Sequence, residues 1–197
     1  MLESSVLRSL VWTDYRLAVL FTVLLPLALM IWAFVNKNEP IHHLFTIYWK
    51  VASLLMITVY LMIGGFQISF ITALMARVLI PVALWFWVDL NEEIGEQPDS
   101  PLKLSFSAWR WSLTFYNIIG AAILIPFLGC AFGGSHLAAP ECQTWLEPPL
   151  LYKQYFHGHY TNGFLGFFGI VGLLVYMASL IWFVFVRLGK QGRQALR

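Results

Sequence analysis

Long hydrophobic runs separated by short polar segments set the pattern of this chain of 197 residues. A membrane-spanning helix needs about 20 mostly apolar residues. Four runs meet that length: residues 17–35, 41–63, 112–132 and 163–186. The first run contains Pro26, which a membrane helix tolerates when a neighbouring group bonds the carbonyl that the proline leaves free. The pattern predicts an all-α, polytopic transmembrane helical bundle.

Residues 64–88 can be placed in two ways. As a separate span, turned from its predecessor at Gly64 and Gly65, the segment gives five spans and leaves Arg77 near the centre of the membrane. Alternatively, one long helix covers residues 51–76, and residues 78–88 form a half-helix or an interfacial segment broken at Pro81. This arrangement gives four spans and moves Arg77 to an interface. We favour five spans, because the segment carries a single charge and Gly-Gly is typical of a turn.

The polar segments divide a single membrane domain, residues 1–197, into its parts. They are an interfacial N-terminal segment (1–16), a cytoplasmic acidic loop (89–111), a non-cytoplasmic loop (134–162) and a basic cytoplasmic tail (187–197). The tail carries four basic residues, and basic segments stay on the cytoplasmic side, so we expect a cytoplasmic C-terminus. The count of basic residues does not decide between four and five spans.

Composition supports the same class of protein and excludes others. Hydrophobic residues make up 59% of the chain and charged residues only 11%, whereas a soluble domain has about 25% charged residues. The net charge of +2 gives no clustered basic face, so nucleic acid is excluded as a partner. The bilayer is the partner that the composition indicates directly.

The two cysteines, Cys130 and Cys142, form a disulfide candidate. Both fall on the side opposite the basic tail, where oxidising conditions permit a disulfide, and eleven residues lie between them. Such a bridge is structural, because the chain has no C-x-x-C redox motif. The alternative is a pair of unbonded thiols.

Histidine offers only a weak metal-binding pattern. His157 and His159 are two residues apart in a loop, a spacing that is common by chance. No histidine lies deep within a predicted span, as the axial ligands of a transmembrane haem would. We therefore predict no metal site and no catalytic residues, and name His157 and His159 only as weak candidates.

Glycine recurs every third residue at the start of the last span, at Gly163, Gly166, Gly169 and Gly172. Small residues let helix backbones approach closely. The stripe therefore predicts tight packing against another helix of the chain. The alternative is a face for a partner subunit or for a flat pigment such as chlorophyll or a carotenoid.

Two charged features remain. Ionisable residues inside a membrane are functional suspects, yet no carboxylate falls within a predicted span to pair with Arg77. The acidic run follows a span directly and has no EF-hand spacing, which argues against a calcium site. We interpret the run either as a solvated cap that repels anionic lipid headgroups and sets the depth of the helix, or as a docking site for a basic partner surface or for basic residues of the same chain. Its carboxylates would oppose the dipole at the C-terminal end of the preceding helix. The docking candidates are Asp89, Glu92, Glu93 and Glu96.

The segments "WTDYRLAVLFTVLLPLALMIWAF", "IYWKVASLLMITVYLMIG", "LWFWVDLNEEI" and "WRWSLTFYN" resemble an uncharacterised family of cyanobacterial integral membrane proteins, a domain of unknown function. The likeness covers about residues 6–120. It implies a photosynthetic host, residence in the thylakoid membrane and association with photosynthetic complexes such as a photosystem. It supplies no site residues.

We therefore expect a non-enzymatic accessory, assembly or subunit protein of a larger membrane complex. The first alternative is a transporter of small molecules or ions, and the second is a pigment- or lipid-binding membrane protein.

Overall fold

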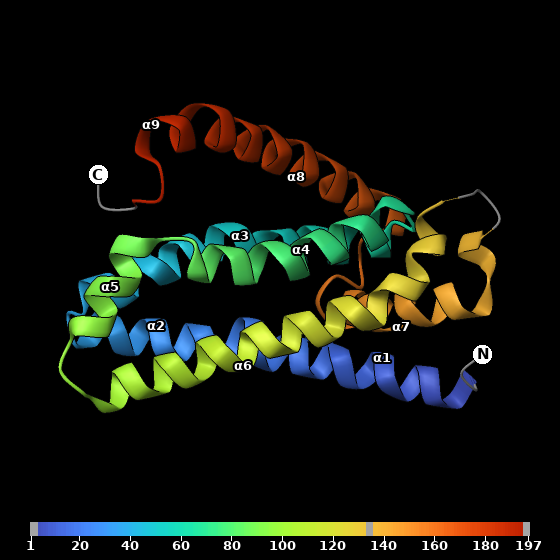
Figure 1. Cartoon of the computed structure of the whole chain (residues 1–197). Coiled ribbons are helices and arrows are strands. Elements are labelled where there is room, and N and C mark those ends of the chain that lie inside the picture. The colour runs from blue at the N-terminus through green and yellow to red at the C-terminus, as the bar shows by residue number, and fades with distance from the viewer. Residues whose placement is uncertain (1–3, 133–135, 195–197) are drawn as a thin grey trace.

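The computed structural model describes residues 4–132 and 136–194, and all regular structure in these residues is helical (Figure 1). In chain order the elements are α1 (Ser4–Ala18), the π-helix η1 (Val19–Leu24), α2 (Leu25–Val35), α3 (Glu39–Ile63), α4 (Ile68–Trp85), α5 (Val88–Glu96), α6 (Pro101–Leu124), the 3₁₀ segments η2 (Ile125–Ala131) and η3 (His136–Ala138), α7 (Pro140–Phe156), α8 (Asn162–Trp182), the π-helix η4 (Phe183–Leu188) and α9 (Gly189–Gln191).

Five stretches of the described chain are long and apolar enough to cross a membrane. They are Ser5–Val35, Glu39–Ile63, Ile68–Trp85, Pro101–Ala131 and Asn162–Leu188. The prediction of a helical bundle with five spans is confirmed, and the alternative of four spans plus a half-helix is wrong. Pro81 lies inside α4 without ending it.

The turn between α3 and α4 explains why the five-span arrangement forms. Gly65 has a φ of +69°, a left-handed conformation that glycine adopts at little cost. A Cβ atom at Gly64 would lie 2.7 Å from the Cα of Gly166 in α8. The Gly-Gly pair therefore provides both the reversal of the chain and a close approach of the last span.

The first span is one helix with a π-helical turn in its middle. In η1 the amide of Leu25 bonds the carbonyl of Leu20, and Pro26 has no amide to donate. Two carbonyls lose their usual partners, and two side chains bond them instead. Trp109 Nε1 donates to the Phe21 carbonyl at 2.9 Å, and the Tyr48 hydroxyl donates to the Thr22 carbonyl at 2.7 Å.

The N-terminal segment is part of this first span rather than a separate helix. α1 runs without a turn into η1 and α2, which gives a helix of 31 residues over Ser5–Val35. At about 1.5 Å per residue the helix is about 46 Å long. Since the hydrocarbon core is about 30 Å thick, the helix extends beyond it at one end or at both ends.

The segments between the spans contain more helix than the sequence pattern indicates. The expected acidic loop, 89–111, consists of α5, a short connection and the first turns of α6, which begins at Pro101 behind a Ser100 cap. The expected loop 134–162 contains α7. α5 lies at the same end of the bundle as α9, and α7 lies at the opposite end near α1 (Figure 1). The tail prediction covers residues 195–197 as well, which lie outside the described residues.

The last span stands apart from the rest of the bundle. α1–α2, α3, α4 and α6 share the largest buried core, which includes Phe45, Tyr48, Phe106 and Trp109. α8 approaches α3 near its own start and diverges toward its end (Figure 1). In the most apolar window of the last span only 11% of the residues are buried, against 44% for α4. Most of α8 therefore faces the surroundings of the protein.

Candidate functional site

A buried ion pair links the first and third spans. Arg77 is the tenth of the 18 residues of α4, so it lies near the middle of that span. Its Nη2 donates to Asp14 Oδ2 at 2.5 Å, and the side chain of Arg77 is only 9% exposed. A charge so far from water is stable only when it is paired. The expectation that Arg77 lacks a carboxylate partner is therefore wrong, because α1 continues into the first span and brings Asp14 beside α4.

Two residues of α6 complete this site. The hydroxyl of Tyr116 donates to Asp14 Oδ1 at 2.9 Å and also lies 3.0 Å from the Asp14 carbonyl. The guanidinium carbon of Arg77 lies 5.3 Å from the centre of the Tyr116 ring. One turn further along α6, Gly120 leaves room for the guanidinium, since a Cβ there would lie 1.8 Å from Arg77 Nη1.

One atom of this cluster is left without a bond. Arg77 Nη1 is buried and has no hydrogen-bond partner among the described residues. A buried guanidinium nitrogen with an unused donor is energetically costly, and such groups concentrate at working sites or beside bound water. The arrangement of Asp14, Arg77 and Tyr116 holds an ion pair and leaves one donor, Arg77 Nη1, for a further acceptor.

The sequence pattern missed Asp14, Tyr116 and Gly120 as members of this site. Asp14 lies in a segment that mixes polar and apolar residues, 1–16, which the hydrophobic pattern places outside the span. The one available signal was the spacing of Tyr116 and Gly120, which are four residues apart and therefore share a helix face. That spacing does not identify which helix the face contacts.

A second acid joins α1 to α7. Glu147 Oε2 accepts from Arg8 Nε at 2.8 Å and from Trp12 Nε1 at 3.1 Å. The Arg8 side chain is 64% exposed, so this pair lies at the surface and contributes little energy. Its role is to hold the end of the first span against the helix that follows the disulfide.

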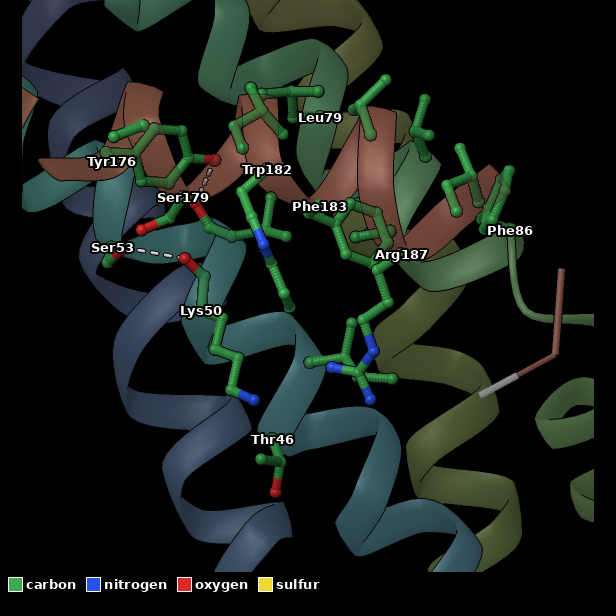
Figure 2. A pocket seen from close by; sticks show the side chains of 18 of the residues that line it. Thr46, Lys50, Ser53, Leu79, Phe86, Tyr176, Ser179, Trp182, Phe183 and Arg187 are labelled. Atoms are coloured by element: carbon green, nitrogen blue, oxygen red, sulfur yellow. Dashed lines mark hydrogen bonds between the residues drawn. The ribbon is translucent and has the colours of Figure 1, made fainter. Parts of the chain in front are cut away.

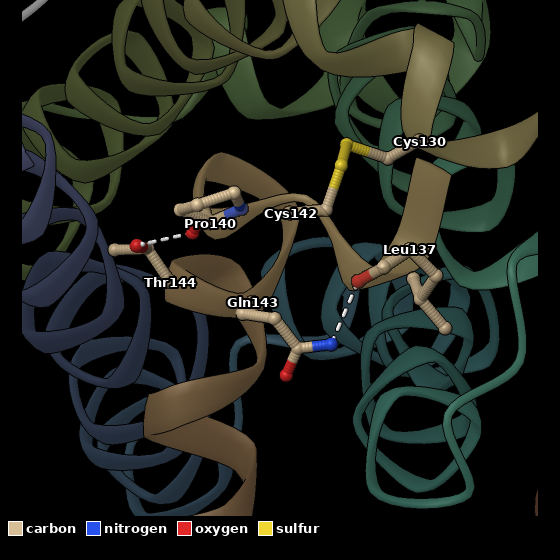
Figure 3. Close-up of a disulfide and its surroundings, with 6 residues drawn as sticks. All are labelled: Cys130, Leu137, Pro140, Cys142, Gln143 and Thr144. Carbon is tan, nitrogen blue, oxygen red and sulfur yellow. Dashed lines mark hydrogen bonds between the residues drawn. A yellow bond between two sulfur atoms is a disulfide. The ribbon is translucent and has the colours of Figure 1, made fainter. Parts of the chain in front are cut away.

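The structure joins Cys130 and Cys142 in a disulfide (Figure 3). Cys130 lies in η2 and Cys142 in the first turn of α7, with their Cα atoms 5.8 Å apart and both side chains buried. Beside the bridge, Gln143 Nε2 donates to the Leu137 carbonyl at 2.7 Å. The bridge fixes α7 to the end of the fourth span.

The acidic residues occupy a helix of their own instead of the end of the preceding span. Asp89 lies in the first turn of α5, where a carboxylate is favourable to the helix dipole, whereas Glu93 and Glu96 lie in the last turn of the same helix, where carboxylates oppose it. Leu90 and Ile94 are buried and hold α5 against the core. The remaining candidates, Glu92, Glu93 and Glu96, are exposed.

The basic residues near α5 bond to oxygens other than these three carboxylates. Lys103 Nζ lies 2.9 Å from the Gly95 carbonyl and 2.5 Å from the Gln97 carbonyl. Arg110 donates to the side chain of Asn91 and stacks 4.0 Å from the centre of the Trp85 ring. The structure therefore leaves Glu92, Glu93 and Glu96 on the outside of α5, and shows no ion pair for them among the described residues.

The glycine stripe of α8 packs in part against α3. A Cβ at Gly166 would lie 2.8 Å from the Cα of Gly64, and one at Gly169 would lie 2.9 Å from the backbone nitrogen of Leu61. At Gly172 the nearest atom is a side-chain carbon, and at Gly163 nothing lies within 4 Å. The middle of the stripe is thus occupied by the protein's own helix, which leaves no room for a pigment there.

The two histidine candidates, His157 and His159, are not arranged as ligands of one metal ion. Nε2 of His157 lies 3.3 Å from the hydroxyl of Tyr60, whereas His159 is exposed. Among the described residues no three histidine, cysteine or acidic side chains gather closely enough to hold a metal ion. Near this histidine, burial and the neighbouring Tyr60 raise the pKa of the Tyr152 hydroxyl above its ordinary value.

These features define a polytopic α-helical membrane protein with a charged pair in its interior. The chain belongs to the family described as "Protein of unknown function (DUF3177)", whose pattern matches residues 8–196. No curated protein and no solved structure matches the chain.

Proposed function

We propose that the protein is a non-enzymatic accessory, assembly or subunit protein of a larger membrane complex. The observation that carries this proposal is the fixed helix α5 with its three outward carboxylates, Glu92, Glu93 and Glu96. Anionic headgroups repel such a cluster, so lipid is a poor neighbour for it. A basic surface of another protein is a favourable one.

The exposure of the last span supports the same proposal. Large aromatic side chains face outward along α8 and η4, including Phe167 at 60%, Phe168 at 52% and Phe185 at 79% exposed. Aromatic residues are enriched where proteins bind each other. A span that buries so little of its surface against its own bundle offers a long face for a helix of a partner.

The cellular setting is part of the proposal. The resemblance to cyanobacterial membrane proteins supports a thylakoid location and a photosynthetic complex, such as a photosystem, as the partner. The basic tail supports a cytoplasmic C-terminus. An absorption spectrum of the purified protein tests whether chlorophyll or carotenoid accompanies it.

Native gel electrophoresis in mild detergent tests the partner complex. We expect the wild-type protein to migrate with a large complex, and the triple variant E92Q/E93Q/E96Q to be released from it, because the carboxylates no longer attract the basic surface. Glu141→Gln is the matched control, since Glu141 is an exposed acid in α7 at the opposite end of the bundle. If the wild-type protein migrates alone or as a small homo-oligomer, the proposal fails.

The second candidate function is transport of a small molecule or ion. The Asp14–Arg77 pair favours it, because intramembrane charges commonly mark transport pathways. The double variant D14L/R77L removes both charges and therefore separates the two candidate functions. We expect the double variant to fold and to retain complex formation in an accessory protein, and to lose all function in a transporter.

A further inference from the structure

A large groove separates the last span from the second and third spans. It has a volume of about 1300 Å³ and lies between α3, α4 and the second half of α8 with η4 (Figure 2). Small-molecule sites are typically about 300–1,000 Å³. The groove is larger than that and opens sideways, so a molecule can enter it from the bilayer.

The groove changes in polarity along its length. Toward the middle of the bundle its walls are apolar or small, with Ile57, Leu79 and Gly172 among them. The opposite end is lined by His43, Lys50 and Arg187. No Asp or Glu is among the residues that line it, all of which the structure describes. One end thus suits hydrocarbon, and the other suits a negative charge.

Lys50 is the residue that indicates an anionic ligand in the groove. It is the twelfth of the 25 residues of α3, which places its Cα near the middle of the span. Its side chain is exposed to the groove and takes part in none of the ion pairs seen between described residues. A lysine at this depth is costly unless its amine reaches an interface or an anion.

The direction of the side chains shows where that anion would be held. In Figure 2 the side chain of Lys50 points toward Thr46 and away from Ser53, and Arg187 extends toward the same end from η4. The C-terminal segment bounds this end. Arg193 Nε donates to the Phe86 carbonyl at 3.0 Å, and the Val88 amide donates to the Arg193 carbonyl at 3.2 Å.

We propose that this groove binds an anionic membrane lipid. Its phosphate contacts Lys50 at the end nearest the C-terminal tail, and its acyl chains extend between α3 and α8 toward Ile57 and Gly172. Basic pockets between spans are a known means of holding anionic headgroups. A neutral pigment or an uncharged partner helix fits the apolar part but leaves Lys50 without a counter-ion. The site does not involve the carboxylates of α5, which carry the proposed partner complex.

Native mass spectrometry and thermal unfolding in a neutral detergent test this site. The probes are phosphatidylglycerol and phosphatidylcholine with identical acyl chains. We expect the wild-type protein to retain phosphatidylglycerol and to be stabilised by it at about tenfold lower concentration than by phosphatidylcholine, because a charge-assisted contact contributes about that factor. Lys50→Gln should abolish the difference between the two lipids.

Two further variants keep the test decisive. Lys190→Gln is the matched control, since Lys190 is an exposed cation of α9 that does not line the groove, and it should keep the preference. Ser179→Trp fills the groove while leaving Lys50 in place, so it should lower the binding of both lipids. Equal binding of the two lipids to the wild-type protein, or an unchanged preference in Lys50→Gln, overturns the proposal. A protein helix found in the groove of the isolated complex overturns it as well.

Discussion

At the scale of single residues, one glycine decides whether a charge can be buried in this bundle. The guanidinium of Arg77 occupies the space that a side chain at position 120 would need. Tyr116, one turn away on the same face of α6, adds a hydrogen bond to Asp14. The ion pair between α1 and α4 therefore depends on a third helix, α6, which provides a large side chain at Tyr116 and no side chain at Gly120.

Gly120→Ala should destabilise the protein by about 3 kcal/mol, the range found when a buried ion pair is broken. Alanine favours a helix over glycine by about 1 kcal/mol, so any loss of stability comes from displacing Arg77. Thermal or denaturant unfolding in detergent measures the change.

Gly163→Ala is the control for that substitution, because nothing lies within 4 Å of a Cβ at this helical glycine. We expect it to be neutral or slightly stabilising. If Gly120→Ala behaves in the same way, the close approach of Arg77 to α6 is contradicted.

The pair itself can be measured with a double-mutant cycle. Asp14→Leu or Arg77→Leu alone should cost about 3–5 kcal/mol, because each leaves one buried charge without a partner. The two together should cost much less than the sum of the single changes. Additive losses would show that the side chains do not interact.

At the scale of elements, the π-helical turn of the first span is stable only because other helices supply hydrogen-bond donors. Trp109 of α6 and Tyr48 of α3 bond the two carbonyls that η1 and Pro26 leave free. The same two aromatic residues lie 5.2 Å apart, edge to face, in the largest core. A local irregularity of the backbone thus becomes the place where three spans meet.

Tyr48→Phe should lower the free energy of unfolding by about 1–3 kcal/mol, the cost of leaving a buried carbonyl without a partner. In a Pro26→Ala background the loss should be smaller, since the new amide can bond a freed carbonyl. Tyr155→Phe is the control, because Tyr155 is 79% exposed. Equal losses in both backgrounds would contradict the role of Tyr48.

The hydrophobic pattern predicts these elements well where length and apolar character decide. It identifies every span, and Gly64–Gly65 identifies the turn between two of them. It fails where tertiary contacts decide: α5 and α7 read as loops because their polar residues and prolines outweigh the few apolar positions that become buried. The pattern also predicts that Pro26 needs a donor, but only the packing of α3 against the first span reveals that Tyr48 supplies it.

At the scale of the whole molecule, the two ends of the bundle are built differently. The end that holds the N-terminus is closed by the disulfide and by α7. The other end carries α5 and α9 (Figure 1). The basic residues that line the groove, His43, Lys50 and Arg187, lie toward this end (Figure 2). An odd number of spans places the two chain termini on opposite sides, so each end faces its own compartment.

Reduction of the disulfide should loosen one end and leave the other intact. For a closed loop of about 15 residues the chain-entropy estimate of the loss is about 3 kcal/mol. We expect the C130S/C142S variant to unfold at a lower temperature than the oxidised protein, and reduced wild-type protein to match the variant. If reduction leaves the unfolding temperature unchanged, the bridge does not support the fold.

The buried ion pair between Asp14 and Arg77 also has a consequence for the order in which the spans insert into the membrane. Asp14 leaves the ribosome long before Arg77, which follows 63 residues later. An unpaired aspartate at the centre of a membrane helix costs about 3 kcal/mol on insertion. The uncharged residues 17–35 can insert alone while Asp14 remains at the membrane–water interface. We expect the first helix to take its final depth only once α4 has arrived, so that the long first span is completed by a helix made after it.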